Sequence, residues 1–303
     1  MSDGSWIAVD WGTSNLRAWH ISAAGAMLDQ AQSDQGMGAL EQTGFETALL
    51  VLITDWLPKD QVTPVIACGM VGARQGWIEA PYVAAPCPLP GVSQSVAAPV
   101  RDPRMSVRIL PGVMQNAPPD VMRGEETQIA GFLSAEPQFD GVLCMPGTHT
   151  KWVRISAGEI VSFQTFMSGE MFAILSQHSV LKHSVGTGWD ADAFAQAVSD
   201  GIARPQALAA RLFALRAAGL LSGMSHDTAR ASLSGYLIGL ELAGSRPYWL
   251  GQDVVVVGRT GLSANYAQAL SAEGATARMI DADGITLAGL GRAYAAHQQE
   301  AST

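Results

Sequence analysis

Short apolar runs separated by turn residues occur twice in the chain, about half its length apart. In the first stretch, the apolar strand Ile7–Asp10 ends in a carboxylate, and the turn Gly12–Asn15 leads into a second strand, Leu16–Ile21. In the second stretch, the strand Val142–Met145 is followed by the turn Gly147–Thr150 and by further strand residues. The pattern predicts a β-hairpin at each place, followed by another turn and a third strand.

The two hairpins resemble each other in detail. DWGTSNLRAWHISAAG and MPGTHTKWVRISAG both contain a Gly-Thr turn, then a basic residue near a tryptophan, then an Ile-Ser-Ala turn. Hairpins can resemble one another by chance, but three features in the same order favour an internal duplication. We therefore expect two related α/β domains, 1–137 and 138–303, and the last helix could pack back on the first domain.

Helical spacing dominates much of the remaining chain. The first domain contains a predicted helix over 45–57 and another over 123–133, with Glu125 and Glu126 in its first turn, where the helix dipole favours carboxylates. Helices of the second domain are predicted over 191–200, 204–218, 226–243, 262–272 and 286–297. The apolar strand Val254–Val257 and a glycine loop precede the fourth of these helices, which is typical of an α/β unit.

Composition narrows the classes of partner. The chain has 303 residues, is 48% hydrophobic and has a formal net charge of -9. An acidic chain lacks the electrostatic footprint of a protein that binds nucleic acid or an anionic membrane. Its three cysteines form no CxxC pair, and it shows neither a signal-peptide pattern nor an apolar run that could span a bilayer. We expect a cytoplasmic protein without nucleic-acid or membrane partners; a homodimer is one possible assembly.

The two Gly-Thr turns are candidates for phosphate binding. A glycine-rich turn between strands presents successive N–H groups that can bind a phosphate. Side-chain donors are added by Thr13, Ser14, Asn15, Thr148 and Thr150. Asp10, at the end of the first strand, could hold Mg²⁺ directly or through water. Either turn alone is more simply an ordinary hairpin, but two turns beside an acidic strand end favour a phosphate site.

Charged residues near these turns have two interpretations each. Lys151 is one of only three lysines and lies in the second hairpin, and Arg17 has a similar position in the first. Both could bind phosphate or lie on an ordinary surface. In the segment Arg123–Glu126, a carboxylate could accept the proton of an attacking hydroxyl, and Arg123 could hold an anionic substrate. A helix N-terminus with favourable charges explains the same residues equally well.

Other motifs are weak. The loop Gly258–Gly261 reads GRTG rather than GxGxxG, so a nicotinamide site is disfavoured, and the alternatives are an adenosine contact or a packing glycine. His178 and His183 lack the spacing of zinc ligands, and no serine lies in a GxSxG motif.

Taken together, these features resemble the superfamily of acetate and sugar kinases, heat-shock ATPases and actin. That resemblance implies an α/β fold of duplicated ribonuclease H-like domains with an interdomain cleft. Within the superfamily, the chain is similar to the 2-dehydro-3-deoxygalactonokinase family. The matching stretches are IAVDWGTSNLRAW, ACGMVGARQGWIEAPY, VMRGEETQIAG, MPGTHTKWV, FMSGE and VVVVGRTGLSANY.

The resemblance implies ATP and Mg²⁺ as cofactors and assigns binding roles by position. The first domain would contact substrate and phosphate and the second would bind the nucleotide. The first phosphate motif would comprise Asp10, Gly12, Thr13, Ser14, Asn15 and Arg17. The second would comprise Gly147, Thr148, His149, Thr150 and Lys151. The adenosine would contact Gly258, Thr260, Gly261 and Leu262. Met145-Pro146 stands where an aspartate-glycine pair is common in the superfamily, which leaves Asp10 as the main metal-side carboxylate.

The catalytic and substrate-side residues also follow from the resemblance. The implied base is Glu126, with Glu125 as the alternative and Arg123 beside them, although many sugar kinases use an aspartate there. The substrate side would include Met70, Arg74, Trp77 and Arg123, and one of the two arginines would pair with the substrate carboxylate.

The expected partners are therefore ATP and a small sugar acid. The reaction implied is transfer of the γ-phosphoryl group to the 6-hydroxyl of 2-dehydro-3-deoxy-D-galactonate, in galactonate catabolism. Alternatives are a kinase of another sugar or 2-keto-3-deoxy acid, a phosphohydrolase of the exopolyphosphatase kind, and an actin-like ATPase that polymerises.

Overall fold

The chain divides into two compact units. In this computed structural model, residues 4–258 and 261–301 are described. The first unit comprises the chain up to Phe139, the segment Ser156–Ser162 and the closing helix from Ala282 onward; the second comprises Asp140–Ile155 and Phe163–Asp281. Each unit contains one Gly-Thr hairpin turn and is described here by itself.

The first unit is built on a six-stranded sheet in the order β3-β2-β1-β4-β8-β7. Its strands are β1 (Trp6–Trp11), β2 (Leu16–Ile21), β3 (Met27–Ser33), β4 (Thr63–Gly69), β7 (Val96–Ala97) and β8 (Met105–Ile109). The pairs β1-β2 and β2-β3 are antiparallel, whereas the pairs β1-β4 and β4-β8 are parallel. The carboxyl ends of β1 and β4 therefore lie side by side, the place where open α/β sheets bind ligands.

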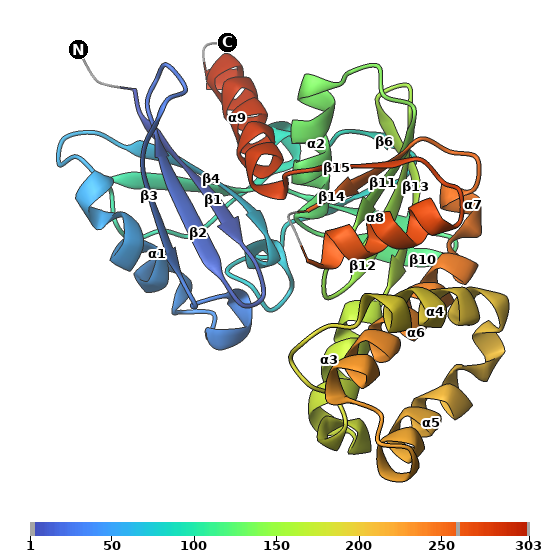
Figure 1. Ribbon diagram of the computed structural model, residues 1–303. Helices are drawn as coiled ribbons and strands as arrows, with labels where there is room; N and C mark the ends of the chain where they lie inside the picture. The colour runs from blue at the N-terminus through green and yellow to red at the C-terminus, as the bar shows by residue number, and fades with distance from the viewer. Residues whose placement is uncertain (1–3, 259–260, 302–303) are drawn as a thin grey trace. The chain divides into compact units, whose positions relative to one another are not determined.

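Helices cover both faces of this sheet, which explains why its central strands are apolar nearly throughout. Helix α1 (Phe45–Ile53) packs on one face in a core that includes Trp11 and Trp77. Helix α9 (Ala282–Ala301) packs on the other, where Tyr294 stacks on Trp6 at a ring distance of 4.4 Å (Figure 1).

Helix α2 (Glu125–Ala135) lies against α9 at a close crossing. A Cβ on Gly131 would overlap the carbonyl oxygen of Ile285, and one on Gly289 would overlap that of Thr127. A small sheet in the order β10-β9-β5 precedes α2 in the chain. Its strands are β5 (Tyr82–Ala84), β9 (Gly112–Asn116) and β10 (Pro119–Met122).

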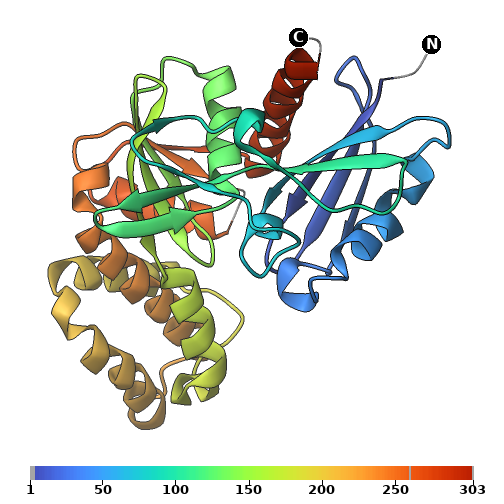
Figure 2. The same cartoon turned by 180° about the vertical axis from the view of Figure 1, so that it is seen from behind.

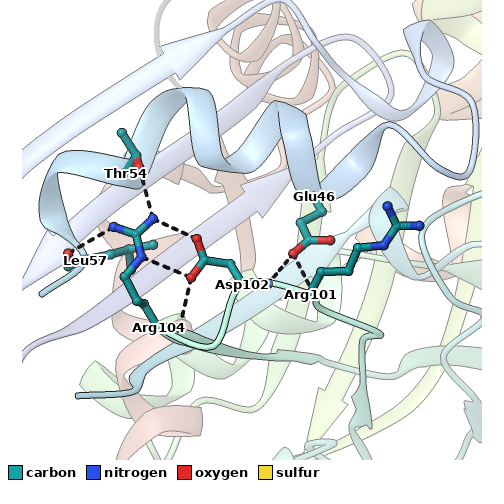
Figure 3. A network of polar contacts seen from close by, with 6 residues as sticks. All are labelled: Glu46, Thr54, Leu57, Arg101, Asp102 and Arg104. Carbon is teal, nitrogen blue, oxygen red and sulfur yellow. Dashed lines mark hydrogen bonds and ion pairs between the residues drawn. The ribbon is translucent and has the colours of Figure 1, made fainter. Parts of the chain in front are cut away.

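A polar network attaches α1 to the segment that leads into β8 (Figure 3). Glu46 Oε1 accepts hydrogen bonds from the backbone N–H groups of Arg101, at 2.6 Å, and Asp102, at 2.8 Å. The Arg104 guanidinium pairs with the Asp102 carboxylate at 2.7 Å and reaches the Thr54 hydroxyl after the end of α1. These bonds add polar anchoring to a segment whose Ala98 and Val100 already pack against the core.

The second unit repeats the sheet of the first. Its strands are β11 (Gly141–Met145), β12 (Thr150–Ser156), β13 (Glu159–Phe166), β14 (Val254–Val257) and β15 (Ala277–Ile280), in the order β15-β14-β11-β12-β13. The start of β13 is counted with the first unit and pairs there with β6 (Cys87–Pro88). The antiparallel hairpin β11-β12 and the parallel strands β14 and β15 match β1-β2, β4 and β8. The predicted duplication is thereby confirmed.

Helices make up the rest of the second unit. They are α3 (Ser168–His178), α4 (Ala191–Ala203), α5 (Leu208–Leu221), α6 (His226–Gly244), α7 (Arg246–Trp249) and α8 (Leu262–Ala272). Helices α4 and α6 cross closely, with Gly201 and Gly239 at the contact. Figures 1 and 2 show α3 to α6 gathered at one end of this unit's sheet.

Short 3₁₀ turns connect several elements. They are η1 (Met37–Ala39), η2 (Thr54–Trp56), η3 (Met70–Gly72), η4 (Val92–Gln94), η5 (Val180–His183) and η6 (Pro205–Ala207). The hairpin strands and the helices predicted from sequence are confirmed within a few residues, but α3 was not predicted. Across the described ranges, no helix has the length and apolarity needed to cross a bilayer.

Candidate active site

The first Gly-Thr turn is supported from behind by η1. Its carbonyl groups at Gly12 and Thr13 accept hydrogen bonds of 2.9 Å from the N–H groups of Met37 and Gly38. A Cβ on Gly36 would overlap the Thr13 carbonyl oxygen, so the close approach requires glycine. The side chains of Thr13, Ser14 and Asn15 are exposed. The turn therefore has a fixed backbone and an open outer face.

The second turn is supported in the same way by the start of α3. The Glu170 N–H donates to the Thr148 carbonyl at 2.9 Å, and a Cβ on Gly169 would overlap the Gly147 carbonyl oxygen. His149 Nε2 lies 2.6 Å from a carboxylate oxygen of Glu170. Both turns thus rest on a glycine-containing segment that follows the third strand of their own sheet.

Thr150 and Lys151, the strand residues that follow the second turn, are buried, unlike Thr148 at the tip of the turn. Thr148 is exposed, whereas Thr150 is fully buried, with its hydroxyl 3.0 Å from that of Tyr266. Lys151 is buried as well, at 5% exposure. Thr148 is therefore presented to solvent, and Thr150 is held inside the unit.

Asp10 ends the buried part of β1 and pairs with a cation. Arg17 donates to Asp10 Oδ2 at 2.6 Å and to Asp283, at the start of α9, at 2.5 Å. The other Asp10 oxygen, Oδ1, lies 3.9 Å from the Cys68 sulfur. Gly69 has a φ of 93°, and a Cβ there would lie 2.6 Å from the Trp11 carbonyl oxygen. This glycine lets β4 end close beside β1.

Asp10 suits one mode of magnesium binding. The described residues contain no group of three or more histidine, cysteine or acidic side chains that could enclose a metal ion. Mg²⁺ bound with nucleotides commonly uses one or two carboxylates together with phosphate oxygens and water. Asp10 Oδ1, which carries no ion pair to Arg17, provides such a carboxylate oxygen.

Glu126, in the first turn of α2, is a buried carboxylate. Its side chain is 3% exposed, and both of its oxygens lie 2.8 Å from the Gly124 nitrogen, whose N–H donates to them. Burial and, second, the charge of Glu125 raise the pKa of Glu126 to about 8, against the opposing hydrogen bond from Gly124. Glu125 is half-buried and accepts the Arg123 N–H at 3.0 Å. The two neighbouring glutamates therefore occupy different environments.

The charges of both Asp10 and Glu126 act on the buried thiol of Cys68. Burial, followed by the charges of Asp10 and Glu126, raises the pKa of this thiol. The thiol therefore stays neutral, and both carboxylates lie near it. The end of β1, the end of β4 and the start of α2 form one acidic site in the first unit.

Arg123 is a buried cation with unused donors. It is 8% exposed, its Nη2 donates to the Ala80 carbonyl at 2.9 Å, and its guanidinium lies 4.2 Å from the Tyr82 ring centroid. Its Nε and Nη1 have no hydrogen-bond partner among the described residues. Buried donors left unpaired are costly, so the arrangement is suited to an anionic ligand.

The other substrate-side candidates differ from Arg123 in their exposure and contacts. Arg74 is well exposed and pairs with Glu79 at 3.4 Å. Met70 is half-buried in η3. Trp77 is buried in the core, stacked on Phe45 and edge-on to Trp11, so its ring serves packing.

A cavity of about 630 Å³ lies in the second unit. It joins two segments singled out in the sequence, Gly147–Thr148 and Gly261–Leu262, which are far apart along the chain. The lining also includes Ser168, Gly169, Phe172, Trp189, Arg230 and Asn265. Its size falls in the range of small-molecule and cofactor sites.

Glycines shape the loop before α8 in this unit. Gly258 has a φ of 141°, and a Cβ there would overlap the Ser263 hydroxyl; Gly261, which precedes α8, has a φ of 80°. Thr260, also predicted to contact adenosine, lies outside the described residues. Trp189 and Arg230 were not singled out because no recognisable motif contains them, and Asn265 lies in the matching stretch VVVVGRTGLSANY but was given no role there.

The comparisons with known proteins address the family. The sequence model of a family described as 2-keto-3-deoxy-galactonokinase matches residues 10–293. The chain belongs to this family. Similar members include a Rhizobium meliloti protein named "Probable 2-dehydro-3-deoxygalactonokinase DgoK1", which is 42% identical over 96% of each chain. The Escherichia coli 2-dehydro-3-deoxygalactonokinase is 35% identical over 94% of this chain and 96% of its own.

Solved structures agree with this family assignment. A crystal structure from Sinorhizobium meliloti, described as a protein of the same kinase type, aligns with a TM-score of 0.90 and 41% identity over 96% of this chain and 99% of that one. The activator of 2-hydroxyisocaproyl-CoA dehydratase from Clostridium difficile aligns with a TM-score of 0.56 at 11% identity, over 99% and 98%, which concerns the fold alone. The predicted fold class and family are confirmed. As a 2-keto-3-deoxy-galactonokinase family member, the chain is a sugar kinase, a phosphotransferase with an alcohol group as acceptor.

Proposed function

We propose that this family member transfers the γ-phosphoryl group of ATP to the 6-hydroxyl of 2-dehydro-3-deoxy-D-galactonate. The product would be 2-dehydro-3-deoxy-6-phosphogalactonate, formed in galactonate catabolism. The names of two relatives that cover nearly the whole chain support this acceptor. The observation that carries the acid class is Arg123, because its buried and unpaired Nε and Nη1 call for an anion. A carboxylate matches the planar fork of a guanidinium in two hydrogen bonds.

Glu126 is the proposed general base. A catalytic base works best when its pKa is near the operating pH, and the pKa of Glu126 is raised to about 8. It lies at the helix start predicted for the base; the charge of Arg123 acts on it, and its own charge acts together with that of Asp10 on Cys68. Glu126 would orient the acceptor hydroxyl and take its proton as the new phosphate ester bond forms.

ATP is proposed to occupy the cavity of the second unit. The exposed turn Gly147–Thr148 offers backbone N–H groups to the phosphates, and the start of α8 at Gly261 and Leu262 would contact the adenosine. Asp10 is the proposed ligand of Mg²⁺, which neutralises charge on the transferred phosphoryl group. In the first unit, the exposed side chains Thr13, Ser14 and Asn15 are proposed phosphate donors.

The test is a coupled ADP assay with Mg-ATP and a panel of acceptors. The panel contains 2-keto-3-deoxy-galactonate, 2-keto-3-deoxy-gluconate and a neutral sugar, and phosphorus NMR locates the new ester. We expect ADP to form with the galactonate derivative and the ester to lie at carbon 6. Faster turnover of another acceptor would replace the named substrate, and phosphate release without any sugar would replace the kinase reaction.

Two matched pairs of variants test the assigned residues. Arg123→Met should raise KM for the acid by about a hundredfold, since a charge-assisted bidentate contact is lost, whereas Arg74→Met, at an exposed arginine, should not. Glu126→Gln should lower kcat by about a hundredfold or more, and Glu125→Gln should change it much less. The reverse ranking in either pair would reassign that role.

A further inference from the structure

A second buried carboxylate, Glu241, lies in the second unit and belongs to no sequence motif. It is on α6 and is 1% exposed. Burying a charge is expensive unless it is well hydrogen-bonded, and an apolar side chain of the same size would avoid that cost. Its burial in the last turn of a helix therefore needs an explanation.

Four side chains from three different elements hydrogen-bond to this carboxylate. Trp152 Nε1, on β12, donates to Oε1 at 2.8 Å, and the Tyr266 hydroxyl, on α8, donates to Oε2 at 2.8 Å. The hydroxyls of Ser168, at the start of α3, and of Thr150, on β12, also hydrogen-bond to it. Burial raises the pKa of Glu241 to about 7, and these four bonds act in the opposite direction.

Two of the three connected elements, α3 and α8, border the proposed nucleotide cavity. Tyr266 and Ser168 line it directly, and the Tyr266 hydroxyl also lies 3.0 Å from that of Thr150, which closes the second Gly-Thr turn. Next to Ser168, Gly169 packs against the Gly147 carbonyl, as described above. One or two hydrogen bonds thus link the Glu241 carboxylate to Thr150 and to Ser168, which belong to the two segments that fix the backbone of Gly147–Thr148.

We propose that Glu241 is a positioning residue for the second phosphate turn, acting on Thr150 both directly and through Tyr266, and acting through Ser168 on the first turn of α3. The role rests on the proposed binding of ATP in this cavity. Glu241 does not contact the nucleotide in this role. It fixes the directions of the Gly147–Thr148 N–H groups, whose aim at the phosphates determines affinity and rate.

The decisive comparison is between two variants that each remove one hydrogen bond to Glu241. Tyr266→Phe removes the bond of 2.8 Å and also the contact of 3.0 Å between the Tyr266 and Thr150 hydroxyls, whereas Trp152→Phe removes a bond of equal length but leaves that contact. Trp152 is fully buried, so its variant loses more packing volume. A purely structural role predicts that Trp152→Phe is the more damaging change.

Titration calorimetry with a non-hydrolysable ATP analogue and steady-state kinetics provide the readouts. We expect Tyr266→Phe to raise the Kd of the analogue and the KM for ATP by about tenfold with an unchanged KM for the acid. Trp152→Phe should stay within about threefold of the wild type in each of these constants. Equal effects on ATP in the two variants, or a larger effect of Trp152→Phe, would overturn the positioning role. If the wild-type protein does not bind the analogue, the proposed ATP site fails and the inference falls with it.

Discussion

Burial of Glu126 should make the stability of the protein fall as the pH rises. In the unfolded chain, Glu126 has its ordinary pKa of 4.5. In the folded protein, its pKa is about 8. Between these pH values the folded state binds more protons than the unfolded state. The contribution of Glu126 to the free energy of unfolding is therefore fully present below pH 4.5 and is lost progressively up to about pH 8. Each tenfold change in proton affinity is worth about 1.4 kcal/mol. The full loss is therefore about 5 kcal/mol, of which about 4 kcal/mol falls between pH 5 and pH 9.

Glu126→Gln removes this titration while keeping the shape of the side chain. Urea unfolding of the wild type, Glu126→Gln and Glu125→Gln across this pH range measures the effect. The free energy of unfolding of Glu126→Gln should exceed that of the wild type by an amount that grows by about 4 kcal/mol with pH, while Glu125→Gln should follow the wild type. Parallel curves for the wild type and Glu126→Gln would refute the assigned environment. Glu241, whose pKa is raised to about 7, adds the same kind of slope to all three proteins and cancels in the comparison.

The same pKa bears on activity. If Glu126 is the base, kcat/KM of the wild type should rise with pH through about pH 8, because only the ionised form accepts the proton. The variant that is more stable at high pH should thus be the inactive one. A pH profile that is flat from pH 6 to pH 9 would remove Glu126 from the catalytic role.

Three further substitutions test the scaffold. Gly169→Ala forces a methyl group onto the Gly147 carbonyl and should lower kcat/KM for ATP by about a hundredfold in a folded protein, as shown by kinetics with circular dichroism as control. Gly131→Ala forces α2 away from Ile285 of α9 and should cost about 3 kcal/mol of unfolding free energy in urea. Glu46→Leu removes two backbone hydrogen bonds (Figure 3) and should cost about 2 kcal/mol while leaving kcat unchanged. An unaltered kcat/KM for ATP in Gly169→Ala, or an unaltered free energy of unfolding in either of the other two variants, would contradict the contacts described.

Local patterns were enough to predict the hairpins and the helix at Glu126. Strand alternation, turn residues and helix-start charges are properties of neighbouring positions, so one sequence contains them. The choice between Glu125 and Glu126 could not be made in this way. It depends on burial, and burial is decided by how the start of α2 lies beside the end of β4 at Gly69 and how α2 packs against α9.

The support behind each turn could not be predicted for a related reason. Helix α3 begins at Ser168, but its contact with Gly147 joins segments separated by two strands, and Gly169 alone gives no sign of it. Glu241 was missed because a glutamate in a predicted helix is usually on the solvent side. Its four hydrogen-bond partners come from β12, α8 and α3, which meet only in the folded unit.

One difference between the duplicated hairpins, at the position of Asp10, fits the proposed division of chemistry. In the first unit, Asp10 faces Arg17 across the β1-β2 ladder and forms an ion pair with it. In the second, Met145 occupies the position of Asp10 and faces Lys151. The first hairpin therefore combines a carboxylate with its own counter-charge, which suits a metal-side ligand. The second hairpin has a methionine instead of a carboxylate at this position, so the proposed metal-side ligand comes from the first hairpin.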